Sequence, residues 1–63
     1  MEFADSIKQI REKLNMSQEM LAKQLGVSFA TVNRWESGKF TPSYKAIKAV
    51  KEFCNNNNII IEY

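Results

Sequence analysis

Apolar residues recur at the three- and four-residue spacing of a helix in four successive stretches of the chain. The pattern predicts helices over residues 3–14, 18–24 and 29–36, and a fourth that opens at Pro42 or Ser43 and stops at the asparagines 55–58. The side chains expected to face a common core are Phe3, Ile7, Ile10, Leu14, Leu21, Leu25, Val32, Trp35, Ala46, Ile47, Val50, Phe53 and Cys54. We therefore expect an all-α, compact four-helix bundle.

Residues that suit helix ends separate these segments. Ser17 and Ser28 precede the second and third predicted helices, where a hydroxyl oxygen can accept a hydrogen bond from a backbone N–H of the first turn. Gly26 and Gly38 follow those helices and adopt the left-handed conformation at no steric cost. Asn15, after the first helix, is the kind of non-glycine residue that tolerates this conformation best.

Residues 18–38 form the most informative segment, because two short amphipathic helices there are joined by a tight turn. Ala22 permits a close approach of the two helix axes, and Gly26 suits the turn. The spacing is typical of a helix-turn-helix, whose second helix lies in the DNA major groove. The alternative is an αα-hairpin that only packs. Polar or small residues on the outer face of residues 29–36 favour DNA binding.

Length and composition limit the other classes. The 63 residues allow one domain, taken as residues 1–54, with a tail at 55–63. No apolar run approaches a membrane span, and the N-terminus has neither the basic region nor the apolar core of a secretion signal, so a cytoplasmic location is expected. With a single cysteine, Cys54, and no histidine, we expect no metal, no cofactor and no catalytic activity.

Positive charge is concentrated in the second half of the chain. Charges sum to zero over residues 1–33, to +4 over 34–51 (five cations and Glu36) and to −2 over 52–63. The positive charge of residues 34–51 is where contact with a negatively charged phosphate backbone is expected. Lys39 and Lys45 flank the motif directly, whereas Lys48 and Lys51 are also consistent with an ordinary solvated face.

The tail allows two alternatives. Asparagines 55–58 favour a turn, and residues 59–63 have strong β-propensity. In one alternative Ile59 or Ile61 folds back to close the core. In the other, which we favour, the tail is a dimerisation strand that pairs with its twin across a dimer axis.

These motifs resemble the Cro and phage-repressor type of helix-turn-helix, the xenobiotic-response-element (XRE) family of bacterial and phage regulators. The resemblance is carried by SIKQIREK and LNMSQEMLAKQLGVSFATVNRWESGKFTPS, and it covers residues 6–54. It implies a lambda-repressor-like fold with residues 29–36 in the major groove.

The resemblance also implies roles for individual residues. Those expected to contact base edges are Phe29, Ala30, Asn33 and Arg34. Those expected to contact phosphates are Ser17, Gln18, Ser28, Thr31, Ser37, Lys39, Thr41 and Lys45. Arg11 and Glu36 match an arginine and a glutamate that pair in phage relatives, between the first helix and the end of the recognition helix. We therefore expect a partly buried ion pair between them.

The expected function is a sequence-specific regulator of transcription, most simply a repressor, that binds double-stranded operator DNA as a homodimer. One alternative is a protein-interaction module such as an antitoxin, with a toxin as its partner. Another is the targeting domain of a larger enzyme such as a DNA methyltransferase.

Overall fold

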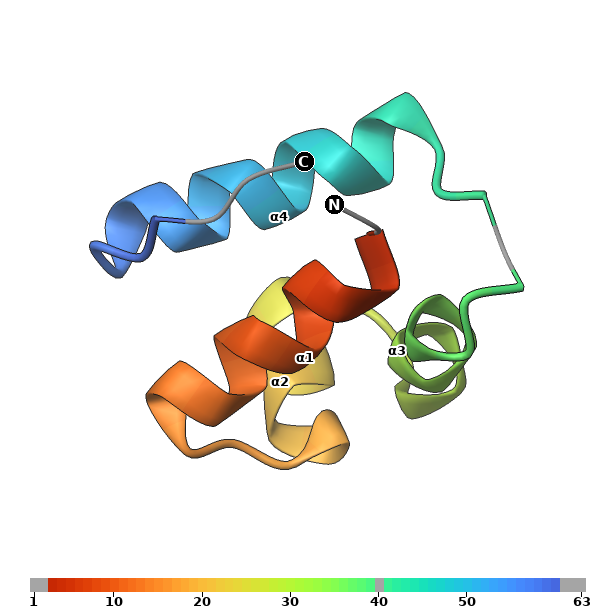
Figure 1. The fold of residues 1–63 in the computed structure, drawn as a ribbon, viewed down its shortest axis with the longest axis horizontal. Helices are drawn as coiled ribbons and strands as arrows, with labels where there is room; N and C mark the ends of the chain where they lie inside the picture. The colour runs from red at the N-terminus through yellow and green to blue at the C-terminus, as the bar shows by residue number, and fades with distance from the viewer. Residues whose placement is uncertain (1–2, 40, 61–63) are drawn as a thin grey trace.

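The computed structural model describes residues 3–39 and 41–60 (Figure 1). Within them the chain forms four helices and no strand: α1 (Phe3–Leu14), α2 (Gln18–Leu25), α3 (Phe29–Glu36) and α4 (Tyr44–Asn56). The predicted all-α fold is confirmed. The bounds of α1 and α3 are those predicted, while α2 is one residue longer and α4 follows Ser43 as its N-cap.

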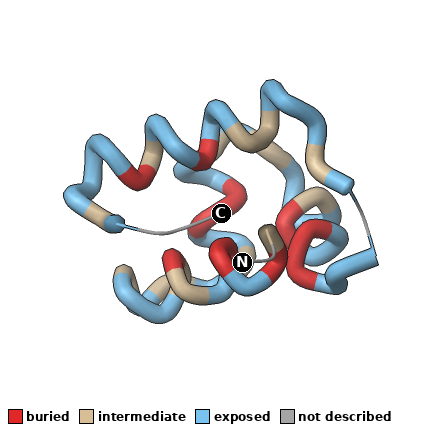
Figure 2. Tube along the Cα trace, turned by 45° about the horizontal axis from the view of Figure 1, so that its top comes forward, coloured by how far each residue is buried: buried red, intermediate tan, exposed pale blue. Residues whose placement is uncertain are grey.

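The core lies where α1, α2 and α3 meet, with α4 packed against α2. Figure 2 shows the buried residues on the inward sides of the helices. The central cluster consists of Ile7, Ile10, Leu21, Ala22, Val32, Trp35, Val50 and Cys54. Ala22 is buried between the helices, as its small size predicted. None of the helices in the described part of the chain combines the length and the apolar character needed to cross a membrane.

Three helices end in the same local structure. The residues with positive φ are Asn15 after α1, Gly26 after α2 and Asn58 after α4, at 55°, 71° and 56°. The N–H of the next residue donates to a carbonyl five residues back, in the pairs Met16 to Arg11 (2.9 Å), Val27 to Ala22 (3.0 Å) and Ile59 to Cys54 (2.8 Å). This is the Schellman arrangement, and the apolar residue that follows each turn packs partly against the core.

The end of α4 lies within the run of asparagines 55–58, as predicted. Asn55 and Asn56 are helical, Asn57 is the C-cap and Asn58 is left-handed, so the helix stops inside the run at its second residue. Asparagine costs a helix only about 0.7 kcal/mol per residue, which the continuing backbone hydrogen bonds offset. A single αL residue is sufficient to end the helix.

The described part of the tail is folded back. Ile59 packs partly against the core, whereas Ile60 is 86% exposed. The first alternative therefore holds for Ile59. Ile61 and the rest of the proposed dimerisation strand, residues 61–63, lie outside the described residues, so pairing of two tails stays a prediction.

Candidate nucleic-acid interface

α3 has one buried side and one exposed side. Val32, Trp35 and Glu36 are buried, while the four residues predicted to contact bases are all exposed: Phe29, Ala30, Asn33 and Arg34. Positions four apart lie one above the other on a helix, so these four residues share one surface, which we name the α3 face. The structure thus brings the predicted base-reading residues together, and their contact with DNA stays a prediction.

The α3 face is chemically divided along the helix. Its first turn carries the half-exposed ring of Phe29 (50%) and the methyl group of Ala30. The polar groups beside them are engaged with each other: the Ser28 Oγ accepts from the Thr31 N–H at 3.1 Å and lies 2.9 Å from the Thr31 Oγ1. The second turn carries the amide of Asn33 and the guanidinium of Arg34. One end of the face is apolar and the other end is rich in hydrogen-bonding groups.

The buried side of α3 is fixed to α1 by two contacts. The rings of Phe3 and Trp35 meet edge to face, with centroids 5.4 Å apart and planes at 80°. Arg11 and Glu36 form an ion pair, with Arg11 Nε 2.6 Å from Oε2 and Nη2 2.8 Å from Oε1. The orientation of the α3 face is therefore set by α1.

The ion pair shifts the pKa of both partners. Burial of the Glu36 carboxylate acts most strongly and would raise its pKa. Hydrogen bonds from Arg11 and Gln18, with the charges of Arg11 and Lys8, together outweigh burial, so the pKa of Glu36 lies below its ordinary value. The hydrogen bond to Glu36 likewise raises the pKa of Arg11. Glu36 is held as a carboxylate at neutral pH.

The residues predicted to contact phosphates lie close to α3 in the sequence: at the starts of α2, α3 and α4, and in the connection between α3 and α4. Those that are exposed are Ser17, Ser28, Ser37, Lys39, Thr41 and Lys45, and those that are partly exposed are Gln18 and Thr31. Several of their polar groups also have structural roles. The Ser17 Oγ caps α2 by accepting from the Met20 N–H at 3.1 Å, and the Ser37 Oγ donates to the Arg34 carbonyl at 2.6 Å. Lys39 and Lys45 present cationic side chains at the surface.

Two features of this region were missed by the sequence reasoning. The side chain of Gln18 hydrogen-bonds to Glu36, which gives it a structural role at the start of α2. Tyr44 is 80% exposed as the first residue of α4, between Thr41 and Lys45 in the chain. Its position directly after the capping Ser43 was the sequence signal that could have identified Tyr44 as an exposed aromatic residue of this region.

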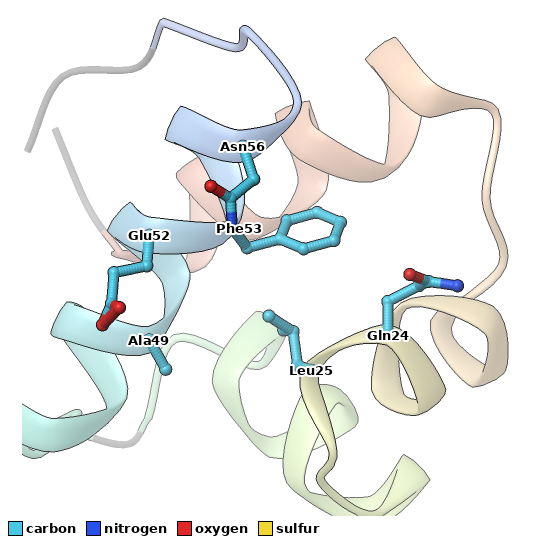
Figure 3. Close-up of a pocket in the computed structure, with 6 residues that line it drawn as sticks. All are labelled: Gln24, Leu25, Ala49, Glu52, Phe53 and Asn56. Carbon is cyan, nitrogen blue, oxygen red and sulfur yellow. The ribbon is translucent and has the colours of Figure 1, made fainter.

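A shallow hollow lies between α2 and α4, lined by Gln24, Leu25, Ala49, Glu52, Phe53 and Asn56. Figure 3 shows the side chain of Leu25 and the ring of Phe53 facing the space between the two helices. Its volume of about 270 Å³ is slightly below the roughly 300–1,000 Å³ of typical ligand pockets. Its lining includes none of the residues predicted to contact DNA. Within residues 3–39 and 41–60, no group of three histidine, cysteine, aspartate or glutamate side chains could hold a metal ion.

Comparison with known proteins places this geometry in a family context. The Helix-turn-helix family matches residues 7–56. The chain is 42% identical over 53 residues to the helix-turn-helix-type transcriptional activator BcrR of Enterococcus faecalis, covering 84% of this chain and 26% of that protein. It is 48% identical over 48 residues to a helix-turn-helix-type transcriptional regulator of Archaeoglobus fulgidus, covering 75% of this chain and 68% of that protein.

A third relative is named as an antitoxin and not as a regulator of transcription. The chain is 38% identical over 47 residues to antitoxin HigA-2 of Vibrio cholerae, covering 75% of this chain and 45% of that protein. No solved structure matches the chain significantly. The shared part is the helix-turn-helix region, and the chain spans only about a quarter of the length of BcrR.

Proposed function

Because the chain belongs to the Helix-turn-helix family of DNA-binding transcriptional regulators, we propose that it reads an operator with the α3 face and represses transcription there as a dimer. The observation that carries this proposal is the division of α3 into a buried side fixed to α1 and an exposed side with base-reading chemistry. A rigid helix that presents its outer residues suits insertion into the major groove.

Each part of the α3 face has a distinct role in the proposal. Arg34 donates two hydrogen bonds to O6 and N7 of a guanine, and Asn33 pairs with N6 and N7 of an adenine. Phe29 and Ala30 make apolar contacts with base edges. The surrounding residues position the backbone: Ser17, Gln18, Ser28, Thr31, Ser37, Lys39, Thr41 and Lys45.

The reach of α3 supports a dimer. Its 8 residues span about 12 Å at the rise of an α-helix, which covers only a few base pairs. Two copies double the sequence that is read, with half-sites roughly 34–36 Å apart, one turn of DNA. The proposed dimer contact is the part of the tail after Ile59, residues 60–63, because Ile59 itself packs against the core.

Repression is the simplest regulatory outcome, because a protein bound at a promoter blocks access without needing a further domain. The relative BcrR is named an activator, and this chain spans 26% of its length. A reporter gene driven by the selected operator separates the two outcomes: repression lowers its expression, whereas activation raises it.

The experiment that tests DNA reading is selection of bound duplexes from a random library at two salt concentrations. The expected result is a palindromic site with half-sites one helical turn apart. Enrichment of a single half-site would contradict the dimer. Failure to enrich any sequence, with only weak and salt-sensitive binding, would contradict the proposal that the chain is a sequence-specific regulator.

The likeness to HigA-2 favours one second candidate, an antitoxin that neutralises a partner protein. The test is growth after expression of the product of each adjacent reading frame, alone and together with this chain. Growth arrest that this chain reverses would support an antitoxin. Absence of any toxic neighbour would contradict it.

A further inference from the structure

In the first turn of α3 the exposed side chains, Phe29 and Ala30, are apolar. The hydroxyl groups beside them, of Ser28 and Thr31, are hydrogen-bonded to each other. We propose that Phe29 and Ala30 recognise the C5-methyl group of a pyrimidine, carried by thymine or by 5-methylcytosine, at one end of each half-site. This inference rests on the proposed function and names the chemistry read by the apolar half of the same face.

The exposure of Phe29 is the first argument. Phe29 is half exposed at the start of the helix that the proposal places in the groove, and Ala30 beside it is exposed as well. Burial of such a ring against another apolar group is favourable, whereas its burial against an unpaired polar group is costly. The occupant of this surface must therefore present an apolar group.

The neighbouring hydroxyls are the second argument. Ser28 and Thr31 could otherwise read a base edge, but the Ser28 Oγ already accepts from the Thr31 N–H at 3.1 Å and contacts the Thr31 Oγ1 at 2.9 Å. One of the two hydroxyl hydrogens lies in this contact, and the other is left for the phosphate contact proposed above. The two exposed side chains left in this turn, Phe29 and Ala30, are both apolar.

The chemistry of the major groove identifies the occupant. Among the groups on the base edges there, the C5-methyl of thymine is the apolar one, and 5-methylcytosine carries the same group. Cytosine presents an amino group and guanine two acceptors, which would lose water against the ring of Phe29 without gaining a partner. The first turn thus favours the methyl group and disfavours unmethylated G·C pairs.

The helix geometry also fixes the spacing. Phe29 and Asn33 are four residues apart, which is about 6 Å along the helix axis. Base pairs are stacked at about 3.4 Å. The methylated pyrimidine is therefore expected within about two base pairs of the adenine and guanine that Asn33 and Arg34 read.

The test uses duplexes of the selected operator in which each thymine in turn is replaced by deoxyuridine, which removes only the methyl group. A further pair carries cytosine or 5-methylcytosine at the sensitive position, opposite guanine. Affinities are measured for the unmodified chain, for Phe29→Ala and for the matched control Asn33→Ala. Both variants change exposed residues of α3, and circular dichroism checks that they remain folded.

The expected result is one deoxyuridine per half-site that weakens binding about fourfold, the effect of one methyl-sized group. Phe29→Ala loses this sensitivity, whereas Asn33→Ala binds more weakly but keeps it. At the same position, the duplex with 5-methylcytosine is bound more tightly than the duplex with cytosine. Sensitivity to the methyl group of thymine but not to that of 5-methylcytosine would overturn the inference that the two share one recognition chemistry.

Three further results would overturn the inference, and they differ in what they imply for the proposed function. Specific binding that is indifferent to every deoxyuridine removes methyl reading and leaves the regulator intact. Methyl sensitivity that persists in Phe29→Ala assigns the contact to other residues. Failure to find any operator overturns the proposed function, and the inference with it.

Discussion

Arg11 and Glu36 are joined by two parallel hydrogen bonds, from Nε to Oε2 at 2.6 Å and from Nη2 to Oε1 at 2.8 Å. The third branch of the guanidinium, Nη1, donates to the carbonyl of Met16 at 3.2 Å. Since Glu36 is the last residue of α3, one side chain links α1, the turn before α2 and the end of α3. This is the arrangement through which α1 controls the position of the α3 face.

Removing one partner of this pair should destabilise the fold strongly. Glu36→Ala leaves the guanidinium without its carboxylate, and we expect a loss of about 3 kcal/mol in the free energy of unfolding. The side chain of Arg11 is 26% exposed, which places the effect at the lower end of the range for buried pairs. Urea denaturation at pH 7, followed by the fluorescence of the buried Trp35, measures it. The matched control Glu52→Ala, an exposed carboxylate on α4, should stay within about 0.5 kcal/mol, and a similar small loss for Glu36→Ala would contradict the prediction.

The same pair predicts an acid-sensitive part of the stability. The pKa of Glu36 is lower in the folded chain than its ordinary value of 4.5, so folding favours the carboxylate. This contribution is fully present above about pH 4.5 and is lost as the pH falls below that value through the lower pKa of the folded state. Urea denaturation between pH 7 and pH 2 should show a smaller acid-dependent loss in Glu36→Gln than in the unmodified chain. Parallel curves for the two proteins would contradict the role of Glu36.

The sequence predicted much of this framework because the relevant signals are local. Apolar spacing placed α1 and α3 between the correct residues, and the capping roles of Ser17 and Ser28 follow from their position before a helix. The extension of α4 to Asn56 was not predictable from asparagine's preferences, because the position of a turn within a run of identical residues depends on which carbonyls the chain can reach.

The tertiary contacts of the site were harder to derive. The pairing of Arg11 with Glu36 came from family resemblance, since residues 25 positions apart have no local signal for contact. The third hydrogen bond of Arg11, to a backbone carbonyl, and the edge-to-face contact of Phe3 with Trp35 depend on the packed geometry of α1. Neither has a sequence signature.

The stability of the fold should depend on which residue occupies the left-handed position 26, directly after α2. A Cβ added at Gly26 would have no atom within 4 Å, so the cost of Gly26→Ala is conformational and not steric crowding. We expect a loss of about 1 kcal/mol in the free energy of unfolding. Gly26→Asn is the matched variant and should lose less, because asparagine tolerates this conformation, as Asn15 and Asn58 do here. Equal losses for both variants in urea denaturation would count against the conformational explanation.

The thiol of Cys54 should be unreactive in the folded chain. It is 4% exposed, and burial raises its pKa, so little thiolate is present at neutral pH and access is limited. A coloured thiol reagent should label the protein slowly in buffer and rapidly in urea. Rapid labelling of the folded protein would contradict this prediction.

Base-reading and phosphate-contacting residues should separate in DNA binding. Arg34→Ala removes the proposed pair of hydrogen bonds to guanine and should lower discrimination at one base pair by about 1–3 kcal/mol. Lys39→Ala should weaken specific and random DNA alike and reduce the slope of log K against log salt by about 0.9. Lys48→Ala, on α4, is the matched lysine control and should change neither quantity. Titrations of operator and random duplex at several salt concentrations distinguish these outcomes, and equal losses on both duplexes for Arg34→Ala would refute its base-reading role.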